Sequence, residues 1–284
     1  MQAFSALPFA TQLCLVIVFG LLVGSFLNVV IHRLPLMLQK DWRKQSLEFL
    51  GQSPEDEENQ TFNLAVPRSR CPNCKAEVTW WQNLPIISYV LLKGRCHNCR
   101  VSISLRYPTV ELLNAACWAG LLIAYGPTWT FAALSLMVSA LLALIFIDAD
   151  HQLLPDDITL PLLWAGILFN LLTEHITISS SLWGAMAGYL VLWVLFWLFK
   201  IVTGKEGFGY GDFKLLAALG AWGGVFILPW VLLLSAILGI VFALTLRVTG
   251  KLAAGEAFPF GPSLATAGGI LITCAPFFPQ LQLF

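Results

Sequence analysis

The sequence predicts an all-α polytopic membrane protein with about eight transmembrane helices and a small cytoplasmic zinc-binding insert. Hydrophobic residues make up 58% of the 284 residues and charged residues only 11%, whereas soluble domains carry about 25% charged residues. The mean hydropathy is +0.77. Basic and acidic residues balance at 16 each, which argues against a nucleic-acid binder.

Eight apolar runs in the chain are candidates for membrane spans. A spanning helix needs about 20 apolar residues, and some of these runs are shorter. The sixth run is short and rich in glycine, so its limits are the least defined. The runs cover residues 12–34, 107–125, 129–147, 158–174, 180–201, 211–223, 225–247 and 260–279.

The basic residues indicate how the chain crosses the membrane. Outside the edges of the spans, Lys and Arg occur only in the connections after the first, fifth and seventh runs. The positive-inside rule places these connections in the cytoplasm and both termini outside. The start of the chain lacks a basic region, which favours a retained signal-anchor over a cleaved signal peptide. The predicted domains are a first span (1–35), an insert (36–106) and a helical membrane core (107–284).

The first span contains features that favour close helix packing. Gly20 and Gly24 form a small-xxx-small pair that lets another helix approach. His32 and Arg33 are expected at the C-terminal end of this helix, near the headgroups, where positive charge is favoured. Structural packing is the favoured interpretation for three nearby polar residues: Ser25, Asn28 and His32.

The insert contains two C-x2-C knuckles that predict a metal site. Cys71–Cys74 and Cys96–Cys99 are separated by 21 residues, just beyond the usual zinc-ribbon spacing. Four thiolates at such spacing suit a tetrahedral structural zinc, and a reducing cytoplasm favours zinc over disulfides. Redox chemistry and a pair of disulfides remain alternatives. The acidic stretch 55–58 is expected to be a solvated loop. The other cysteines are interpreted as small core residues: Cys14, Cys117 and Cys274.

Glu111 lies about one turn inside the second apolar run. A charge at that depth needs a partner or a protonated state, which makes the residue a functional candidate. An ion pair with a loop cation such as Arg106 is an equally weighted structural alternative.

Two aspartates at the borders of apolar runs form the predicted active site. Asp148 closes the third run, and Asp212 opens the sixth after glycines at 207, 209 and 211. The predicted topology puts both on one face of the membrane. Two adjacent carboxylates do not readily hold two full charges, so one tends to keep its proton while the other is ionised. Such a pair can activate water, and the glycines leave room for a peptide backbone.

The neighbouring polar residues have simpler interpretations. Asp156 and Asp157 follow Pro155 and are expected to cap the next helix. Asp150 and His151 are solvated residues or supporting partners of the aspartates. Lys214 either stabilises a nearby carboxylate or meets lipid phosphate, and the Pro-Phe-Gly-Pro stretch at 259–262 is expected to begin the last helix.

Together these segments resemble the type IV prepilin peptidases. The resemblance covers nearly the whole chain in order, and the full set is far more specific than a lone G-x-G-D, which presenilin-like proteases also carry. The segments are Gly24–Pro35, the two knuckles, Arg106-Tyr-Pro with Glu111, Asp148 with Leu154-Pro155-Asp156, Gly209-x-Gly211-Asp212-x-Lys214-Leu215, and Pro-Phe-Gly-Pro.

The resemblance implies two activities at the cytoplasmic face of the bacterial inner membrane. Members cleave the leader of type IV prepilins and type II secretion pseudopilins, then N-methylate the new terminus with S-adenosylmethionine. Asp148 and Asp212 would be the catalytic pair, acting through water without an acyl-enzyme. For the methyl donor, the cytoplasmic insert is a candidate, including the Lys93-Gly94-Arg95 turn between the knuckles.

Three other functions are weighed against this one. Another G-x-G-D membrane aspartic protease would lack methyltransferase activity. A proton-coupled carrier should show internal repeats and acids near mid-bilayer, whereas these acids lie at helix ends. A zinc-bearing assembly factor would leave the two aspartates unexplained.

Overall fold

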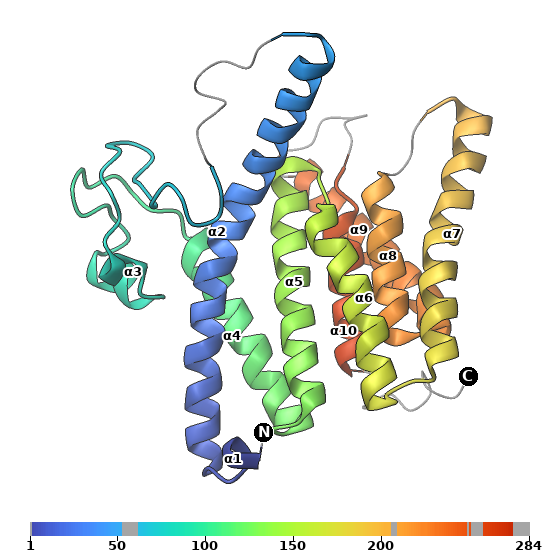
Figure 1. Cartoon of the computed structure of the whole chain (residues 1–284), viewed down its shortest axis with the longest axis horizontal. Helices are drawn as coiled ribbons and strands as arrows, with labels where there is room; N and C mark the ends of the chain where they lie inside the picture. Colours follow the sequence, from blue (N-terminus) through green and yellow to red (C-terminus); the bar gives the residue numbers. More distant parts are fainter. Residues whose placement is uncertain (1, 53–61, 206–208, 249, 251–257, 275–284) are drawn as a thin grey trace. The chain divides into compact units, whose positions relative to one another are not determined.

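The computed structural model describes residues 2–52, 62–205, 209–248, 250 and 258–274. Within these ranges the fold is helical, and the only strand-like pairing is two isolated β-bridges in the insert. The chain divides into two compact units, Met1–Thr128 and Trp129–Phe284. Figure 1 shows the helices of both units.

Unit 1 is built on two long helices with the insert between them. The insert contributes only short helices, because its sequence is rich in turn-forming residues and cysteines. The elements are α1 (Gln2–Ser5), α2 (Phe9–Phe49), η1 (Trp80–Asn83), α3 (Ile87–Leu91) and α4 (Arg106–Tyr125).

Helix α2 is much longer than the sequence predicts. The expected helix end near Arg33 is wrong, since α2 continues through Pro35 to Phe49. Proline removes one backbone donor but does not forbid a helix when the next residues favour it. Those residues are mostly Leu, Met, Gln, Lys, Arg and Glu, which are strong helix formers.

The two glycines of α2 bring it against α4, as the sequence predicts. A Cβ on Gly20 would lie 2.8 Å from the Cα of Ala115, and one on Gly24 would lie 2.7 Å from the Cα of Glu111. Asn114 Nδ2 donates to the Gly20 carbonyl at 2.7 Å. Asn28 Nδ2 donates to the carbonyl of Tyr107 at 3.1 Å. The expectation that Asn28 serves packing is confirmed, and the two helices run antiparallel.

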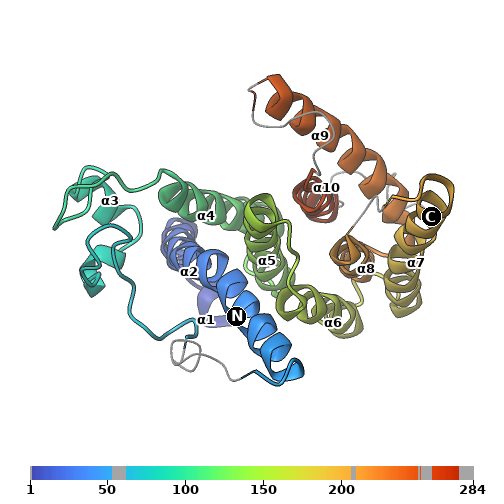
Figure 2. The same ribbon diagram turned by 90° about the horizontal axis from the view of Figure 1, so that it is seen from above.

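Unit 2 contains the remaining helices. Its central element is α8, which packs against α6, α7 and α10 (Figure 2). The elements are α5 (Trp129–His151), α6 (Asp156–Thr173), α7 (Ile178–Thr203), α8 (Tyr210–Gly223), η2 (Val225–Ile227), α9 (Leu228–Val248) and α10 (Gly261–Cys274).

Helices α7 and α8 pack backbone to backbone. A Cβ on Gly184 would collide with the Gly220 carbonyl, and a Cβ on Gly220 would collide with the Gly184 carbonyl. Ser181 Oγ donates to the Ala221 carbonyl at 2.6 Å, and Asn170 Nδ2 of α6 donates to the same carbonyl at 2.9 Å. These contacts fix α8 between its neighbours and therefore position the residues at its N-terminus.

Each of the eight predicted spans contains a helix of the structure. Six helices are long and apolar enough to cross a membrane, with the η2–α9 segment counted as one. Helices α8 and α10 have 14 residues each. The predicted start of the last helix at the Pro-Phe-Gly-Pro stretch is confirmed, since α10 begins at Gly261 and the N–H groups of Ser263 and Leu264 bond to the Phe260 carbonyl.

Candidate active site

Asp148 and Asp212 lie together inside unit 2. Asp148 is in the last turn of α5, and Asp212 is in the first turn of α8. Their exposed fractions are only 6% and 7%. The carboxylate of Asp148 is near enough to act electrostatically on that of Asp212. The structure therefore brings together the two aspartates singled out from the sequence, which are 64 positions apart in the chain.

Glycines let the surrounding backbone approach the pair. A Cβ on Gly261 would lie 2.5 Å from Asp148 Oδ2. The first residue of α10 must therefore be glycine for the helix to begin this close to Asp148. A Cβ on Gly211 would lie 2.7 Å from the Cβ of Leu154. Leu154 is buried and would also contact a side chain at Gly261. Gly261 and Leu154 were not identified as site residues from the sequence, although the Pro-Phe-Gly-Pro and Leu-Pro-Asp motifs contain them.

Helix N-termini supply hydrogen-bond donors to both carboxylates. The backbone N–H of Gly261, at the start of α10, donates to Asp148. The N–H of Gly209, the N-cap residue of α8, donates to Asp212. The positive ends of helix dipoles stabilise negative charge at such positions. Gly207, which the sequence analysis grouped with these glycines, lies outside the described residues.

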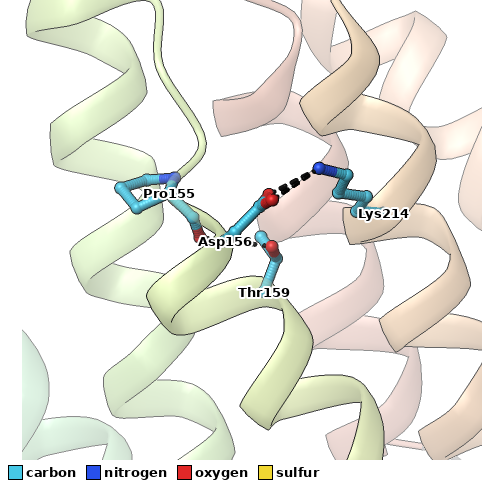
Figure 3. Close-up of polar contacts among 4 residues, drawn as sticks. All are labelled: Pro155, Asp156, Thr159 and Lys214. Atoms are coloured by element: carbon cyan, nitrogen blue, oxygen red, sulfur yellow. Dashed lines mark hydrogen bonds and ion pairs between the residues drawn. The ribbon is translucent and has the colours of Figure 1, made fainter. Parts of the chain in front are cut away.

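Lys214 and Asp156 form an ion pair beside the aspartates (Figure 3). Lys214 Nζ lies 2.7 Å from both carboxylate oxygens of Asp156, joining α8 to α6. The prediction that Asp156 caps α6 is wrong, because the N-cap is Pro155 and no side-chain cap bond forms. Thr159 Oγ1 instead donates to the Pro155 carbonyl at 3.2 Å. The first turn of α6 is thus free to present Asp156 to the neighbouring helix.

The other polar residues of the α5–α6 connection face outward. Asp150, His151 and Asp157 are all exposed. Asp157 occupies the first turn of α6, where its charge favours the helix dipole without a cap bond. None of the three shares the burial of the two candidate aspartates.

The four cysteines of the insert form a cluster within unit 1. The Sγ atoms of Cys71, Cys74, Cys96 and Cys99 lie within 4.8 Å of one another, so they could hold a metal ion. The Cys71 and Cys99 sulfurs are 3.8 Å apart. Tetrahedral zinc with Zn–S bonds of about 2.3 Å requires sulfurs about 3.8 Å apart. The arrangement fits such a site.

The two knuckles repeat the same backbone design. The N–H of Cys71 donates to the Ala76 carbonyl, and the N–H of Cys96 donates to the Val101 carbonyl. Each knuckle ends in a residue of positive φ, 58° at Lys75 and 61° at Arg100. The repeat places the two cysteine pairs in equivalent settings around one centre.

Nearby donors also favour thiolate sulfurs. The backbone N–H of Val101 and the side-chain amide of Asn73 lower the pKa of Cys99 to about 6. The backbone N–H of Ala76 and the amide of Asn98 lower the pKa of Cys74. Asn73 reaches Cys99, and Asn98 reaches Cys74, each at 3.6 Å, so each knuckle donates to a sulfur of the other. Thiolates are the form that metals bind.

Two family models match this chain. The bacterial peptidase A24 N-terminal domain matches residues 18–125, and the type IV leader peptidase family matches residues 135–244. The chain belongs to the type IV leader peptidase family. The first match covers the helix pair and the cysteine cluster, and the second covers both candidate aspartates.

Curated relatives of this leader peptidase family are about half identical to the chain. The prepilin leader peptidase/N-methyltransferase of Stutzerimonas stutzeri is 51% identical over 270 residues, covering 93% of this chain and 91% of the relative. The same-named protein of Aeromonas salmonicida is 51% identical over 259 residues, covering 91% and 89%. That of Pseudomonas aeruginosa is 48% identical over 265 residues, covering 93% and 91%. No solved structure matches the chain.

Glu111, in the N-terminal domain of this leader peptidase fold, is a buried hydrogen-bond acceptor. Its Oε2 accepts the backbone N–H of Ile86 at 2.8 Å, and the Ser25 hydroxyl is also within hydrogen-bonding reach. Ile86 has a φ of 58°, which is costly for a β-branched residue. The local sequence does not predict a positive φ at Ile86. Glu111 thus holds a strained turn of the insert against the helix pair.

Gly94, the sequence candidate for cofactor binding, has a structural setting. Its φ is 65°, and a Cβ there would lie 2.7 Å from the hydroxyl oxygen of Tyr89. Tyr89 in turn donates its hydroxyl to the Ile103 carbonyl at 3.3 Å. The turn before Cys96 therefore requires glycine for the backbone and for packing.

Proposed function

We propose that this protein cleaves the leader peptides of type IV prepilins and type II secretion pseudopilins, then N-methylates the new amino terminus. The observation that carries the proposal is the buried, facing pair Asp148 and Asp212 in a chain about half identical to proteins named for both activities. The concentration of basic residues in alternate connections supports placing the pair on the cytoplasmic face of a bacterial inner membrane.

The pair suits proteolysis by activated water. The ionised aspartate accepts a proton as the water oxygen attacks the scissile carbonyl carbon, and the protonated aspartate donates its proton to the carbonyl oxygen. Collapse of the tetrahedral intermediate breaks the C–N bond, and the leaving amine takes up a proton from the pair. Water is the nucleophile throughout, so no acyl-enzyme forms. Gly209 and Gly261 hold the carboxylates in place through their backbone N–H groups.

We further propose that zinc binds Cys71, Cys74, Cys96 and Cys99 and stabilises the insert. The sulfur spacing and the asparagine donors support this assignment. The insert contributes few residues to the core, so a closed tetrahedral site would supply stability that burial does not.

Purified protein should contain about one equivalent of zinc. Cys71→Ser should lower the metal content and make the insert more sensitive to protease, with Cys14→Ser as the control. Full metal content in Cys71→Ser would contradict the assignment.

Methyl transfer from S-adenosylmethionine makes different chemical demands from proteolysis. It needs a neutral substrate amine and an in-line methyl donor, but no carboxylate pair. We therefore propose that it uses a separate site. The residues of that site are not assigned, since the glycine conformation and the Tyr89 contact already account for Gly94.

One experiment tests both activities. Asp212→Asn protein in proteoliposomes should fail to cleave a full-length prepilin, yet it should still methylate a peptide supplied without its leader. Asp150→Asn serves as the matched control, because Asp150 is an exposed carboxylate in the same helix turn as Asp148. Near-normal cleavage by Asp212→Asn would contradict the proteolytic assignment. Loss of methylation by folded Asp212→Asn, with the control active, would indicate a single shared site.

A further inference from the structure

We propose that the segment Leu84–Leu91, which contains α3, lies in the membrane interface and contacts an anionic lipid bilayer through an apolar stripe. This segment belongs to the insert, which the sequence analysis predicted to be cytoplasmic. Three sets of observations support the proposal: the exposed side chains of α3, the points at which the insert is attached to α2 and α4, and the charge around the segment.

Helix α3 presents its apolar side chains outward. Ile87, Val90 and Leu91 have exposed fractions of 56%, 65% and 70%. Their i, i+3, i+4 spacing places them on one face of the helix. Tyr89, on the opposite side, turns inward and donates to the Ile103 carbonyl. The helix thus has the reverse of the pattern expected for a helix in water.

The insert is attached to the spanning helices at increasing depth. Near the headgroups, Arg33 donates to the Asn63 carbonyl at 2.9 Å. Ser25 contacts the Asn83 carbonyl at 3.4 Å and lies seven residues before His32, about 10 Å deeper along α2. This contact holds the start of the segment well below Arg33, the first Lys or Arg residue of the helix.

Helix α4 gives an independent measure of depth. Glu111 binds the Ile86 N–H and lies five residues after Arg106, about 7–8 Å inside α4. Leu112 and Leu113, the next residues of this spanning helix, are also exposed. The stripe of α3 therefore lies at a depth similar to that of apolar side chains that a candidate spanning helix leaves exposed.

The charge around the segment complements an anionic bilayer. Residues 62–106 contain seven Lys and Arg residues and a single acid, Glu77. Glu77 is already paired with Arg70 at 3.0 Å. Lys93 and Arg95 are exposed and follow the stripe directly. Apolar residues next to cations are typical of segments that bind the interface of anionic membranes.

The test measures the depth of labels in vesicles. The parent protein for this test has Cys14, Cys117 and Cys274 replaced by alanine, and a nitroxide is attached to it at Val90→Cys. The same parent without Val90→Cys measures how much label attaches to the four-cysteine cluster. Collision with oxygen, which concentrates in hydrocarbon, is compared with collision with a water-soluble nickel chelate. Leu112→Cys is the lipid-facing control, and Gln45→Cys, exposed on the polar extension of α2, is the aqueous control.

In vesicles of phosphatidylethanolamine and phosphatidylglycerol, the label at Val90 should shift toward the Leu112 values and away from those of Gln45. It should become shallower when phosphatidylcholine replaces both lipids, while the Leu112 label stays unchanged.

Water exposure of the Val90 label equal to that of Gln45 would overturn the proposal. Protection that appears only after adding the apolar segment of a protein substrate would also overturn it and identify a protein-docking surface. Equal depth in both vesicle types would overturn the requirement for anionic lipid.

Discussion

Glu111 in unit 1 and the aspartate pair in unit 2 are equally buried carboxyl groups with different surroundings. Glu111 and Asp212 each have an exposed fraction of 7%. Glu111 faces a backbone N–H and a hydroxyl, whereas Asp148 and Asp212 face each other with one backbone donor each. Burial alone therefore does not mark an acid for catalysis. The feature that does so is a second carboxylate with which a proton can be shared.

Glycine also acts differently in the two regions. Because Gly24 has no side chain, the backbone of α2 packs directly against the backbone of α4 at Glu111. At Gly261 the absence of a side chain leaves space that the carboxylate of Asp148 occupies. The same residue type produces tight helix packing in unit 1 and room beside a candidate catalytic carboxylate in unit 2.

The largest expected effect is the loss of cleavage on neutralising either aspartate. Asp148→Asn and Asp212→Asn keep side-chain size but remove a proton-transfer group, so leader cleavage should fall by at least about 10²–10⁴-fold. Glu111→Gln, an equally buried carboxyl-to-amide change, should stay within a few-fold of the parent. Initial rates on a prepilin in proteoliposomes give the measurement. Comparable losses in all three variants would remove the distinction between the two regions.

The next effect concerns the packing that positions Asp212. Gly184→Ala places a methyl group against the Gly220 carbonyl, so α7 and α8 must separate. Overpacking of this kind costs about 1–3 kcal/mol, and cleavage should fall with stability. Thermal unfolding in detergent measures the first effect and the leader assay the second. Gly120→Ala is the control, because no atom lies within 4 Å of its added methyl. Equal stability of the two variants would contradict the close contact.

Removing the acceptor at Glu111 should destabilise unit 1 without affecting the chemistry in unit 2. Glu111→Leu leaves the N–H of Ile86 unpaired, which costs about 1–3 kcal/mol, whereas Glu111→Gln keeps an acceptor oxygen. Limited proteolysis of the insert should be faster in Glu111→Leu, while the catalytic rate of the intact fraction should be unchanged. A catalytic defect in Glu111→Gln at normal stability would assign Glu111 a chemical role.

The smallest expected effect comes from the ion pair between α6 and α8. Asp156 and Lys214 are partly exposed, so their interaction should contribute at most about 0.2–1 kcal/mol. Lys214→Met and Asp156→Asn should each lower cleavage by no more than about fivefold, an amount equivalent to that energy. The double variant should be no worse than either single one. A loss in Lys214→Met as large as in Asp212→Asn would mean that Lys214 acts on the reacting groups.

Features that depend on periodicity and composition could be predicted from the sequence. The apolar runs gave the helices, the Gly20–Gly24 pair gave the close approach of α4, and the positions of Asp148 and Asp212 at the ends of apolar runs gave their proximity. The cysteine spacing likewise predicted one cluster. Each of these features follows from local pattern together with the membrane as a constraint.

Features that depend on contacts between distant segments were not predictable. Asp156 carries the signature of a helix cap, but Lys214, 58 residues later, pairs with it instead. Pro35 reads as a helix end, yet favourable residues beyond it extend α2 to Phe49. The positive φ of Ile86 runs against its β-branched side chain and depends on the acceptor at Glu111. In each case the outcome depends on residues outside the local pattern from which the prediction was made.

The shortness of α8 has a consequence for substrate selection. Its 14 residues span about 21 Å, while the hydrocarbon of a bilayer is about 30 Å thick, and the adjacent α7 has 26 residues. Phe196 of α7 contacts Tyr210 and Phe213 in the first turn of α8, so the last turns of α7, up to Thr203, extend past the depth of Asp212. A helical substrate offers no free carbonyl at that depth, so it must unwind there before water can attack. The work of unwinding is least where helix propensity is low, so a glycine beside the scissile bond lowers the barrier before any side chain is recognised.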